Sequence, residues 1–382
     1  MNELPTCDST VGVVGASARA AAMSLARAGY SAWAVDLFTD RDLKRIAPCV
    51  RCSFADFPEA LPQLAERFPP GPMFYTGGLE NYPDVVRELA RRRPLWGNGP
   101  EVLAQVRDPF ELAVVVKTPV ACASGSPVPT TGEWLVKSLR SSGGLGVRWA
   151  RPGEIVPTGC YLQEFISGTP MSAVFHGKHL LGVTEQLIGT TWLHSRPFHY
   201  AGTIAPIALP LEVTSELSLL GEQLVEAFGL TGLFGVDFIL KDGEPWVLEV
   251  NPRYPASAEV LEHAGGFAAF NPLASRERKR PEFSTVAKGI YFAPRELRFP
   301  EAGPWDADLT GPFDPWRLPG FADIPEPGEP IEASSPVLTF FAEGTTVAEC
   351  RKLLQTQAGQ LDELFLAILT RKPAPIDEGV RS

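Results

Sequence analysis

The pattern of hydrophobic and polar positions in the first hundred residues predicts strands that alternate with helices. A β-prone run at 11–14 leads through a turn at 15–17 into an alanine-rich stretch at 19–28, and a second β-prone run follows at 32–36. The order strand, helix, strand is typical of a parallel sheet. Further runs of both kinds follow, strand-like at 73–78 and helical at 83–93.

The rest of the chain changes character twice. Residues 119–129 are rich in Ser, Gly and Pro, which marks a link between lobes, and charge and proline gather again at 276–281. Between these links the pattern predicts three strands and a long helix, at 134–139, 160–166, 180–186 and 214–228. Later runs predict two strands and a final helix, at 286–292, 337–341 and from 346 onward. We therefore predict an α/β (α+β) chain of three domains, with the bounds 1–105, 106–275 and 276–382.

Composition restricts the partners that such a chain can bind. The 382 residues include 34 Lys and Arg and 45 Asp and Glu, and the resulting net charge of −11 argues against nucleic acid or an anionic membrane as partner. No stretch reaches the roughly 20 apolar residues that a membrane-spanning helix needs. The first five residues also lack the basic and apolar parts of a signal peptide. We therefore expect a cytoplasmic protein that acts on small molecules.

The most informative stretch is a predicted antiparallel hairpin. Two apolar, β-prone runs flank Lys241-Asp242-Gly243-Glu244, and symmetry about this turn places Asp237 opposite Glu249 to within one residue. Asn251 projects from the same face as Glu249, because side chains alternate along a strand. Two carboxylates about 5 Å apart repel unless a cation lies between them. The three oxygens therefore predict a Mg²⁺ or Mn²⁺ site; the alternative is an exposed hairpin with solvated acids.

A second group of residues suits a nucleotide triphosphate. The strand at 134–139 carries Lys137, and the glycine-rich loop after it offers backbone N–H groups to phosphates, with the candidates Ser141, Ser142, Gly143, Gly144 and Gly146. This is not a P-loop, because the lysine precedes the glycines. The apolar strand at 160–166 ends in residues that suit an adenine ring, namely Gln163, Glu164, Phe165 and Ile166. Taken alone, the first stretch is equally compatible with a Gly-rich hairpin and a solvated lysine.

Two other features leave alternatives open. The turn at 15–17 and Asp36 at the end of the next strand are arranged as in dinucleotide-binding folds, but the glycines do not form a GxGxxG pattern, and a simple tight connection explains them as well. The stretch 192–202 gathers His194 and His199 with Arg and aromatic residues. It is either a wall of an acceptor cleft or a surface loop.

The order of these pieces carries more information than any one of them. A strand lysine, a glycine-rich loop, a QEFI strand, a helix, a GVDF hairpin and an EVNPR segment together resemble the ATP-grasp superfamily of ATP-dependent ligases, most closely the uncharacterised carboligase group related to biotin carboxylase. The resemblance covers about 106–266. It implies an ATP-grasp fold of two lobes with ATP between them, after an N-terminal Rossmann-like pre-ATP-grasp domain. Residues 324–344 are similar to the small β-rich domain that follows in carboxylase-like members.

The resemblance also implies roles for single residues. Lys137 would contact the α- and β-phosphates, the loop 141–146 would close over the triphosphate, and 163–166 would form the adenine hinge. The implied metal ligands are Asp237, Glu249 and Asn251, and the implied catalytic residues are Arg253, which steadies the transferred phosphate, and Lys137.

Two positions depart from the family pattern. Pro109 stands where many relatives have a second phosphate-binding lysine, which leaves Arg107 and Lys117 as candidate replacements. The stretch 169–172 lacks the acid that holds the ribose.

The expected function is an ATP- and Mg²⁺-dependent ligase that joins a small-molecule or amino-acid carboxylate to an amine through an acyl phosphate and forms ADP. The expected partners are therefore ATP, a carboxylate and an amine, and a homodimer stays open. Two alternatives remain: a carboxylase of the biotin carboxylase type that activates bicarbonate, and a nucleotide-binding module without turnover.

Overall fold

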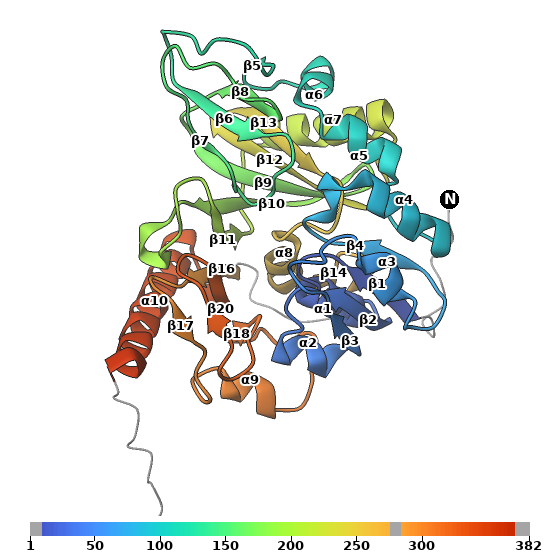
Figure 1. The fold of residues 1–382 in the computed structure, drawn as a ribbon, viewed down its shortest axis with the longest axis vertical. Coiled ribbons are helices and arrows are strands. Elements are labelled where there is room, and N and C mark those ends of the chain that lie inside the picture. The colour runs from blue at the N-terminus through green and yellow to red at the C-terminus, as the bar shows by residue number, and fades with distance from the viewer. Residues whose placement is uncertain (1–9, 276–283, 371–382) are drawn as a thin grey trace, which may run out of the picture.

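The computed structural model describes residues 10–275 and 284–370, and it begins with a parallel sheet (Figure 1). The four strands run in the order β3-β2-β1-β4, and all three pairings are parallel, as the alternation of strands and helices predicts. The strands are β1 (Thr10–Val14), β2 (Ser31–Asp36), β3 (Cys49–Arg51) and β4 (Met73–Tyr75). The helices are α1 (Arg19–Arg27), α2 (Arg41–Ile46), α3 (Leu61–Ala65), the 3-10 helix η1 (Leu79–Asn81), α4 (Pro83–Arg92), α5 (Pro100–Val106) and α6 (Pro109–Val115).

A small antiparallel sheet forms the upper lobe in Figure 1. Its order is β5-β8-β6-β7, with β5 (Ala121–Cys122), β6 (Trp134–Ser138), β7 (Arg148–Trp149) and β8 (Cys160–Glu164). β6 and β8 pair along their whole length, which brings the strand that carries Lys137 beside the strand that carries Gln163. The two predicted nucleotide-binding strands are therefore neighbours.

The largest sheet has eight strands and extends from the middle of the chain into its C-terminal part. Its order is β13-β12-β9-β10-β11-β16-β20-β18. The first five in sequence are β9 (Thr169–His176), β10 (His179–Ile188), β11 (Tyr200–Ala205), β12 (Leu233–Lys241) and β13 (Glu244–Asn251). The C-terminal strands are β16 (Thr285–Phe292), β18 (Phe321–Ala322) and β20 (Pro336–Gly344).

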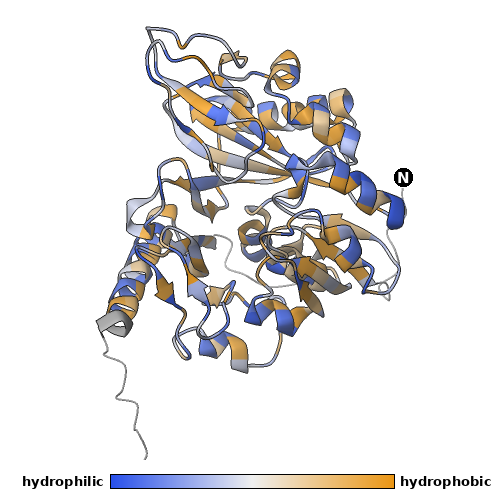
Figure 2. Ribbon diagram, viewed as in Figure 1, coloured by the Kyte–Doolittle hydropathy of each residue, from blue (hydrophilic) through white to orange (hydrophobic). Residues whose placement is uncertain are grey.

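Helices cover both faces of this sheet. α7 (Leu211–Phe228) and α10 (Val347–Thr370) pack on one face, and α8 (Ala258–Gly265) lies between the other face and α1 of the N-terminal sheet (Figure 1). The helix predicted at 214–228 is confirmed as part of α7, whose residues Leu217, Leu220, Leu224 and Phe228 are buried against the sheet. Figure 2 shows hydrophobic positions along the strands of the sheet and hydrophilic ones on outer helices such as α4. The remaining elements are η2 (Thr191–Leu193), β14 (Phe267–Ala268), β15 (Asn271–Ser275), β17 (Leu297–Arg298), α9 (Asp306–Thr310) and β19 (Pro330–Ile331).

Three strands of the predicted C-terminal domain, β16, β18 and β20, belong to the eight-stranded sheet, and only β17 and β19 among the described residues after 284 form a sheet of their own. β16 pairs with β11 along 202–205, so hydrogen bonds join the two sides of the predicted boundary at 275/276. The three domain bounds therefore stay predictions, and the proline-rich link predicted at 276–281 lies outside the described residues. None of the helices that the structure describes is long and apolar enough to cross a membrane.

Candidate functional site

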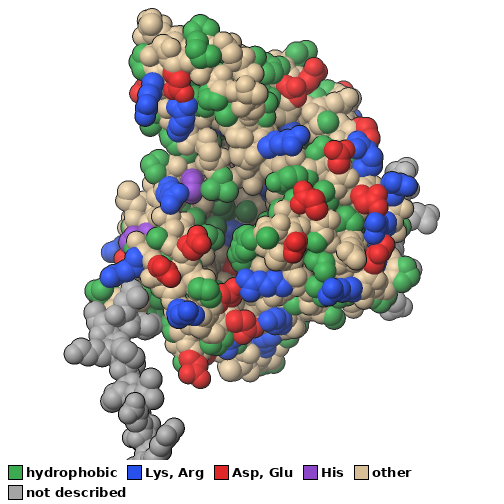
Figure 3. All heavy atoms as spheres, viewed as in Figure 1, with side chains coloured by type: hydrophobic (Ala, Val, Ile, Leu, Met, Phe, Trp, Pro, Cys, Tyr) green, Lys and Arg blue, Asp and Glu red, His purple; other side chains and the backbone are tan. Residues whose placement is uncertain are grey.

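A cavity of about 810 Å³ lies where the small sheet, the eight-stranded sheet and the N-terminal loops meet. Figure 3 shows the molecular surface hollowed between the upper and lower parts of the molecule. Almost all residues predicted for the site line this cavity: Lys137, Ser141, Ser142, Gly143, Gly144, Gln163, Glu164, Phe165, Ile166, Asp237, Glu249, Asn251 and Arg253. Gly146 does not line it, and a Cβ at that position would instead meet the Cβ of Ser138 at 3.6 Å.

The hairpin β12–β13 brings the two predicted acids together. Asp237 pairs with Glu249 and Gly235 pairs with Asn251, so the predicted register is confirmed. The turn residues Asp242 and Gly243 both have positive φ, +52° and +83°, as a tight hairpin turn requires. The pairs next to the turn extend from Lys241 and Glu244 to Phe238 and Val247, and a bulge between Asp237 and Phe238 then shifts the register by one residue, so that Asp237 faces Glu249.

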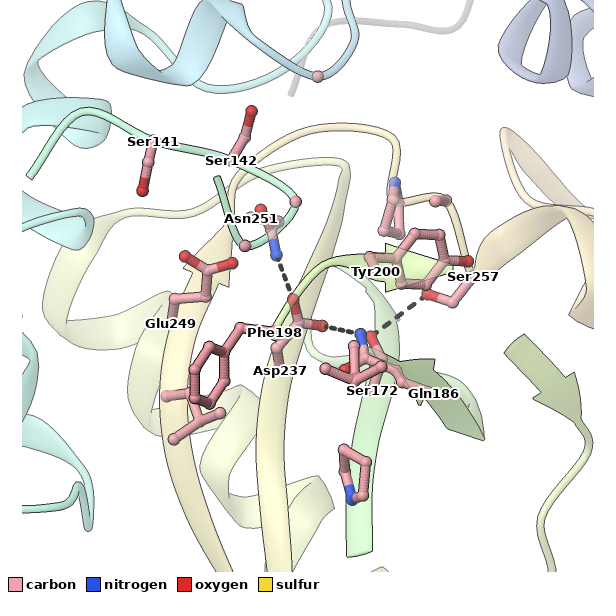
Figure 4. Close-up of a pocket in the computed structure, with 18 of the residues that line it drawn as sticks. Ser141, Ser142, Ser172, Gln186, Phe198, Tyr200, Asp237, Glu249, Asn251 and Ser257 are labelled. Atoms are coloured by element: carbon pink, nitrogen blue, oxygen red, sulfur yellow. Dashed lines mark hydrogen bonds between the residues drawn. The ribbon is translucent and has the colours of Figure 1, made fainter. Parts of the chain in front are cut away.

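Amide groups surround the carboxylate of Asp237. Oδ2 accepts a hydrogen bond from Nδ2 of Asn251 at 2.9 Å, and Oδ1 accepts one from Nε2 of Gln186 on β10, also at 2.9 Å (Figure 4). Burial, reinforced by the negative charge of Glu249, raises the pKa of Asp237 to about 6. No cation pairs directly with this carboxylate among residues 10–275 and 284–370, so the site is short of positive charge at this point.

Glu249 has the opposite environment. Burial alone would raise its pKa, but Arg107, Lys137 and Arg253 outweigh burial and hold the pKa below its usual value. Nη1 of Arg107 donates to Oε2 of Glu249 at 3.0 Å. The two facing acids therefore differ, because Glu249 stays ionised beside a cation while Asp237 relies on amides.

The oxygen atoms of Asp237, Glu249 and Asn251 suit a hard divalent cation. Such ions prefer carboxylate and carbonyl oxygens and keep further positions for water and phosphate. In the part of the chain that the structure describes, no three His, Cys, Asp or Glu side chains gather into a metal site. The donor set available is therefore two carboxylates and one amide, which fits Mg²⁺ or Mn²⁺ shared with a phosphate ligand.

Of the two candidates for the missing lysine, only Arg107 lies at the site. Besides Glu249, it donates from Nη2 to the backbone oxygen of Ser141 in the glycine-rich loop at 2.8 Å. Lys117 instead pairs with Glu244 at the exposed end of the hairpin and lies 4.1 Å from the ring centre of Trp246. Arg107 thus links the loop to the carboxylates.

Arg253 is held by a residue that the sequence analysis missed. Nη2 donates to Oδ1 of Asn251 at 3.0 Å, while Nε and Nη2 donate to Oε1 of Glu80 at 3.2 and 2.9 Å. Glu80 lies in η1 and is buried, and its Oε2 has no partner among the described residues. A single acid in a loop after a strand carries no sequence signal for this role, because its partner lies 173 residues away.

The predicted hinge and its lysine form a connected wall. Nζ of Lys137 donates to Oε1 of Gln163 at 3.1 Å. Burial would lower the pKa of Lys137, but Tyr161 and Glu249 raise it above its usual value, so the ammonium stays charged. Phe165 contacts Trp149 edge-on, with ring centres 4.9 Å apart, and both rings line the cavity.

The glycine-rich loop closes against the loop before β11. The oxygen of Gly143 accepts a hydrogen bond from the backbone N–H of Tyr200 at 3.1 Å. Gly144 has φ +82°, and a Cβ there would lie 1.9 Å from the backbone oxygen of Phe198. Phe198 and Tyr200 line the cavity, so this part of the stretch 192–202 is a cleft wall. His194 does not line the cavity; its Nε2 pairs with Oδ1 of Asp362 on α10 at 2.6 Å.

Asp36 has a structural role, which the comparison with dinucleotide-binding folds did not predict. Its carboxylate is fully buried and accepts hydrogen bonds from the backbone N–H groups of Ala18 at 3.0 Å and Thr39 at 2.8 Å. It thereby provides a hydrogen-bond acceptor for a backbone N–H group at the start of α1, and it does not line the cavity. The turn at 15–17 is a tight connection whose Ala16 and Ser17 reach the cavity wall.

Comparisons with known proteins agree with this geometry. Residues 110–257 match the model of a protein family described as ATP-grasp domain. An uncharacterized protein of Methanocaldococcus jannaschii is 34% identical over 101 residues, which are 26% of this chain and 24% of that protein. The chain thus matches about a quarter of the length of this curated relative.

Solved structures share the fold over nearly the whole chain. An L-amino acid ligase from Bacillus licheniformis is 17% identical, with 93% of this chain and 97% of that one covered and a TM-score of 0.65. An N5-carboxyaminoimidazole synthetase from Staphylococcus aureus, in complex with ADP, is 15% identical over 93% and 100%, with a TM-score of 0.63. The biotin carboxylase domain of a Hydrogenobacter thermophilus 2-oxoglutarate carboxylase, with MgADP and bicarbonate, is 14% identical over 88% and 86%, also with a TM-score of 0.63.

Proposed function

We propose that this chain is an ADP-forming ligase of the ATP-grasp superfamily that joins a small carboxylic acid to an amine. The observation that carries the proposal is the cation-deficient pair Asp237 and Glu249, which opens into the same cavity as Lys137, Arg253 and the glycine-rich loop. Buried like charges that face each other are tolerated where a bound cation completes them. A nucleotide with its metal ion supplies that cation.

The metal ligands in this proposal are Asp237, Glu249 and Asn251. Mg²⁺ would neutralise the β- and γ-phosphates and so lower the barrier for attack by an anion. The chain supports this arrangement, because Arg107 fixes Glu249 and Arg253 fixes the amide of Asn251. Both arginines also add positive charge near the transferred phosphate.

The remaining residues bind and shield the nucleotide. Lys137 provides a point charge for the α- and β-phosphates, and Gln163, Glu164, Phe165 and Ile166 hold the adenine ring at the edge of β8. The loop with Ser141, Ser142, Gly143 and Gly144 covers the phosphates, and the hydrogen bond from Tyr200 to Gly143 keeps it closed. Exclusion of water matters here, because water hydrolyses an acyl phosphate.

The reaction would proceed in two transfers. A carboxylate oxygen attacks the γ-phosphorus, the bond between that phosphorus and the bridging oxygen of ADP breaks, and an acyl phosphate forms. The amine nitrogen then attacks the acyl carbon, phosphate leaves with its bonding electrons, and the nitrogen loses a proton. The products are an amide, ADP and phosphate.

The test is a screen for ADP formation with pairs of carboxylic acids and amines, in the presence and absence of Mg²⁺. We expect ADP release that requires both an acid and an amine. ADP release that requires bicarbonate instead would select the carboxylase alternative. Tight ATP binding without ADP in every reaction would select a nucleotide-binding module.

One variant tests whether the ADP formation measured in the screen depends on the carboxylate pair. Glu249→Gln should abolish turnover, because it removes a charged metal ligand and the counter-charge of Arg107. Glu244→Gln is the matched control, since Glu244 lies on the same strand but is exposed and pairs with Lys117. Full activity of the Glu249→Gln protein would remove this residue from the site.

A further inference from the structure

One face of the eight-stranded sheet lines the cavity beyond the region assigned to the nucleotide. Asp237 on β12 pairs with Ser172 on β9, Ile188 on β10 pairs with Tyr200 on β11, and Ile290 on β16 pairs with Thr339 on β20. All six residues line the cavity. Paired residues project from the same face of a sheet, so the cavity continues from the metal carboxylates across β11 to the C-terminal strands.

The charged side chains in this further half of the cavity already have partners. Nζ of Lys288 on β16 donates to the backbone oxygen of Ala256 at 2.6 Å and to Oε2 of Glu259 at 3.1 Å. Arg19 pairs with Glu259 and with Asp323, whose Oδ1 it reaches at 2.8 Å. These groups therefore offer little free charge to a ligand.

The hydroxyl group of Tyr200 differs from these charged groups. It is buried and has no hydrogen-bond partner among the residues that the structure describes. In Figure 4, Tyr200 lies beside Ser257, on the other side of Asp237 from Glu249. A buried hydroxyl without a partner lowers the stability of the fold, so its retention in a cavity wall points to a ligand that accepts its hydrogen bond.

The position of Tyr200 suggests which ligand that is. The adenine hinge lies on β8 of the small sheet, whereas Tyr200 lies on β11, beyond Asp237 as seen from Glu249. A group that attacks the γ-phosphate in line must approach from the side opposite to ADP. The region in front of Tyr200 is on that side of the metal carboxylates, so it suits the attacking acid better than the nucleotide.

We propose that the Tyr200 hydroxyl donates a hydrogen bond to the substrate carboxylate and that the cavity over β11 and β16 is the carboxylic acid site. This inference rests on the proposed ligase function. The phenol keeps its proton throughout: one carboxylate oxygen forms the bond to the γ-phosphorus, the bond from that phosphorus to ADP breaks, and the other oxygen stays bound to Tyr200.

The backbone of Tyr200 connects this site with the closed loop. Its N–H donates to the oxygen of Gly143 at 3.1 Å, so closure over the nucleotide and placement of the Tyr200 side chain depend on the same residue. Binding of the acid should therefore favour the closed loop, which excludes water when the acyl phosphate forms.

A kinetic experiment tests the role of the hydroxyl. Tyr200→Phe removes one oxygen and keeps the ring. With the acid that supports ADP formation in the screen, we expect the KM for the acid to rise about 10- to 100-fold, the usual effect of losing a hydrogen bond to a charged group. The KM for ATP should stay unchanged. Tyr291→Phe is the matched control, because it removes a hydroxyl that bonds Asp362 at 2.6 Å and does not line the cavity.

A binding experiment tests, without requiring turnover, whether the Tyr200 hydroxyl binds a carboxylate. Crystals of the full chain with MgADP are soaked in sodium acetate, which serves as the carboxylate probe. We expect acetate at hydrogen-bond distance from the Tyr200 hydroxyl in the wild type and no acetate there in Tyr200→Phe. Acetate bound elsewhere in the cavity, or bound equally in both proteins, would overturn the inference, as would an unchanged KM for the acid.

Failure of the proposed function looks different. If the wild-type protein does not bind MgADP, the ligase assignment itself fails. If MgADP binds but Tyr200→Phe does not change the KM for the acid, only the assignment of Tyr200 fails.

Discussion

Two carboxylates of this molecule, the buried Glu259 and the half-buried Asp237, differ in the charges that surround them. Glu259 on α8 contacts Arg19 and Lys288. Burial alone would raise its pKa, but these two cations hold the pKa well below its usual range. Asp237 on β12 is hydrogen-bonded to neutral groups, among them the amides of Asn251 and Gln186, and faces a second acid, and its pKa is raised to about 6 by burial and by Glu249.

The difference distinguishes a cluster whose charges are balanced within the protein from one that we propose binds a cation. Glu259 joins α8 to α1 and β16, and its charges are balanced within the protein. Asp237 is partly accessible from the cavity and lacks a cation of its own. Buried charges that are paired stabilise one arrangement of the chain, whereas an unbalanced pair is stable only with a bound cation.

The largest effect should come from the structural carboxylate. Glu259→Gln leaves Arg19 and Lys288 buried with less counter-charge, and loss of one partner of a buried ion pair typically costs about 3–5 kcal/mol of unfolding free energy. Denaturation by urea measures this loss. Glu326→Gln, in an exposed pair with Lys44, should change stability by less than about 1 kcal/mol. Equal losses of unfolding free energy in the two variants would show that Glu259 contributes no more to stability than an exposed acid.

Asp36 offers an intermediate case, because backbone N–H groups and no cation hold its buried carboxylate. Burial raises its pKa to about 6, against 3.8 as the usual value. A raised pKa in the folded state means that the stabilisation is complete below the unfolded pKa and is lost as the pH rises through about 6.

The Asp36→Asn protein should therefore lose less stability than the wild type between about pH 4 and pH 7, by about 3 kcal/mol. Unfolding free energies at both pH values give this difference. Parallel pH profiles of the two proteins would show that Asp36 does not titrate in this range.

A smaller effect, on activity only, is expected at the loop that covers the functional pair. Gly144→Ala places a methyl group 1.9 Å from the oxygen of Phe198, so the loop cannot close as it does here. We expect kcat/KM for ADP formation to fall about 10- to 100-fold, as for other losses of active-site closure. Gly153→Ala is the control, since Gly153 has a similar φ of +74° but no atom within 4 Å of the new Cβ. An equal loss in both variants would assign the effect to backbone strain.

The smallest expected effect has the opposite sign to that of Glu259→Gln. Asp237→Asn is the same change from carboxylate to amide, but it removes a repulsion with Glu249. We expect the protein without ligands to gain about 1 kcal/mol of stability and to lose affinity for MgADP. Thermal unfolding with and without MgADP measures both. Destabilisation together with unchanged affinity would contradict the functional interpretation of this pair.

The sequence predicts the part of the site that depends on local pairing. The turn at Asp242 and Gly243 places Asp237 opposite Glu249 to within one residue, and a bulge beside Asp237, which the pattern does not predict, sets the final pairing. Lys137 and the glycine-rich loop follow from a second local pattern, to which the resemblance adds their roles, and they also lie at the cavity. Gly146 does not line the cavity, and a Cβ there would face Ser138.

The rest depends on contacts between distant segments. Glu80 reaches Arg253 and Gln186 reaches Asp237 only after three parts of the chain have packed together. The pairing of β11 with β16 likewise extends one sheet across the expected boundary at 275/276. Periodicity reports which face of an element is apolar, not which element packs against it, so these features needed the structure.

The most direct test of the account is the position of the metal ion. Crystals grown with ADP and Mn²⁺ locate manganese by its anomalous scattering. We predict a peak about 2.0–2.6 Å from oxygens of Asp237 and Glu249 and from a phosphate of ADP. Bound ADP whose manganese lies away from both carboxylates, or a peak held by neither of them, would contradict the claim that this pair holds the nucleotide's metal ion.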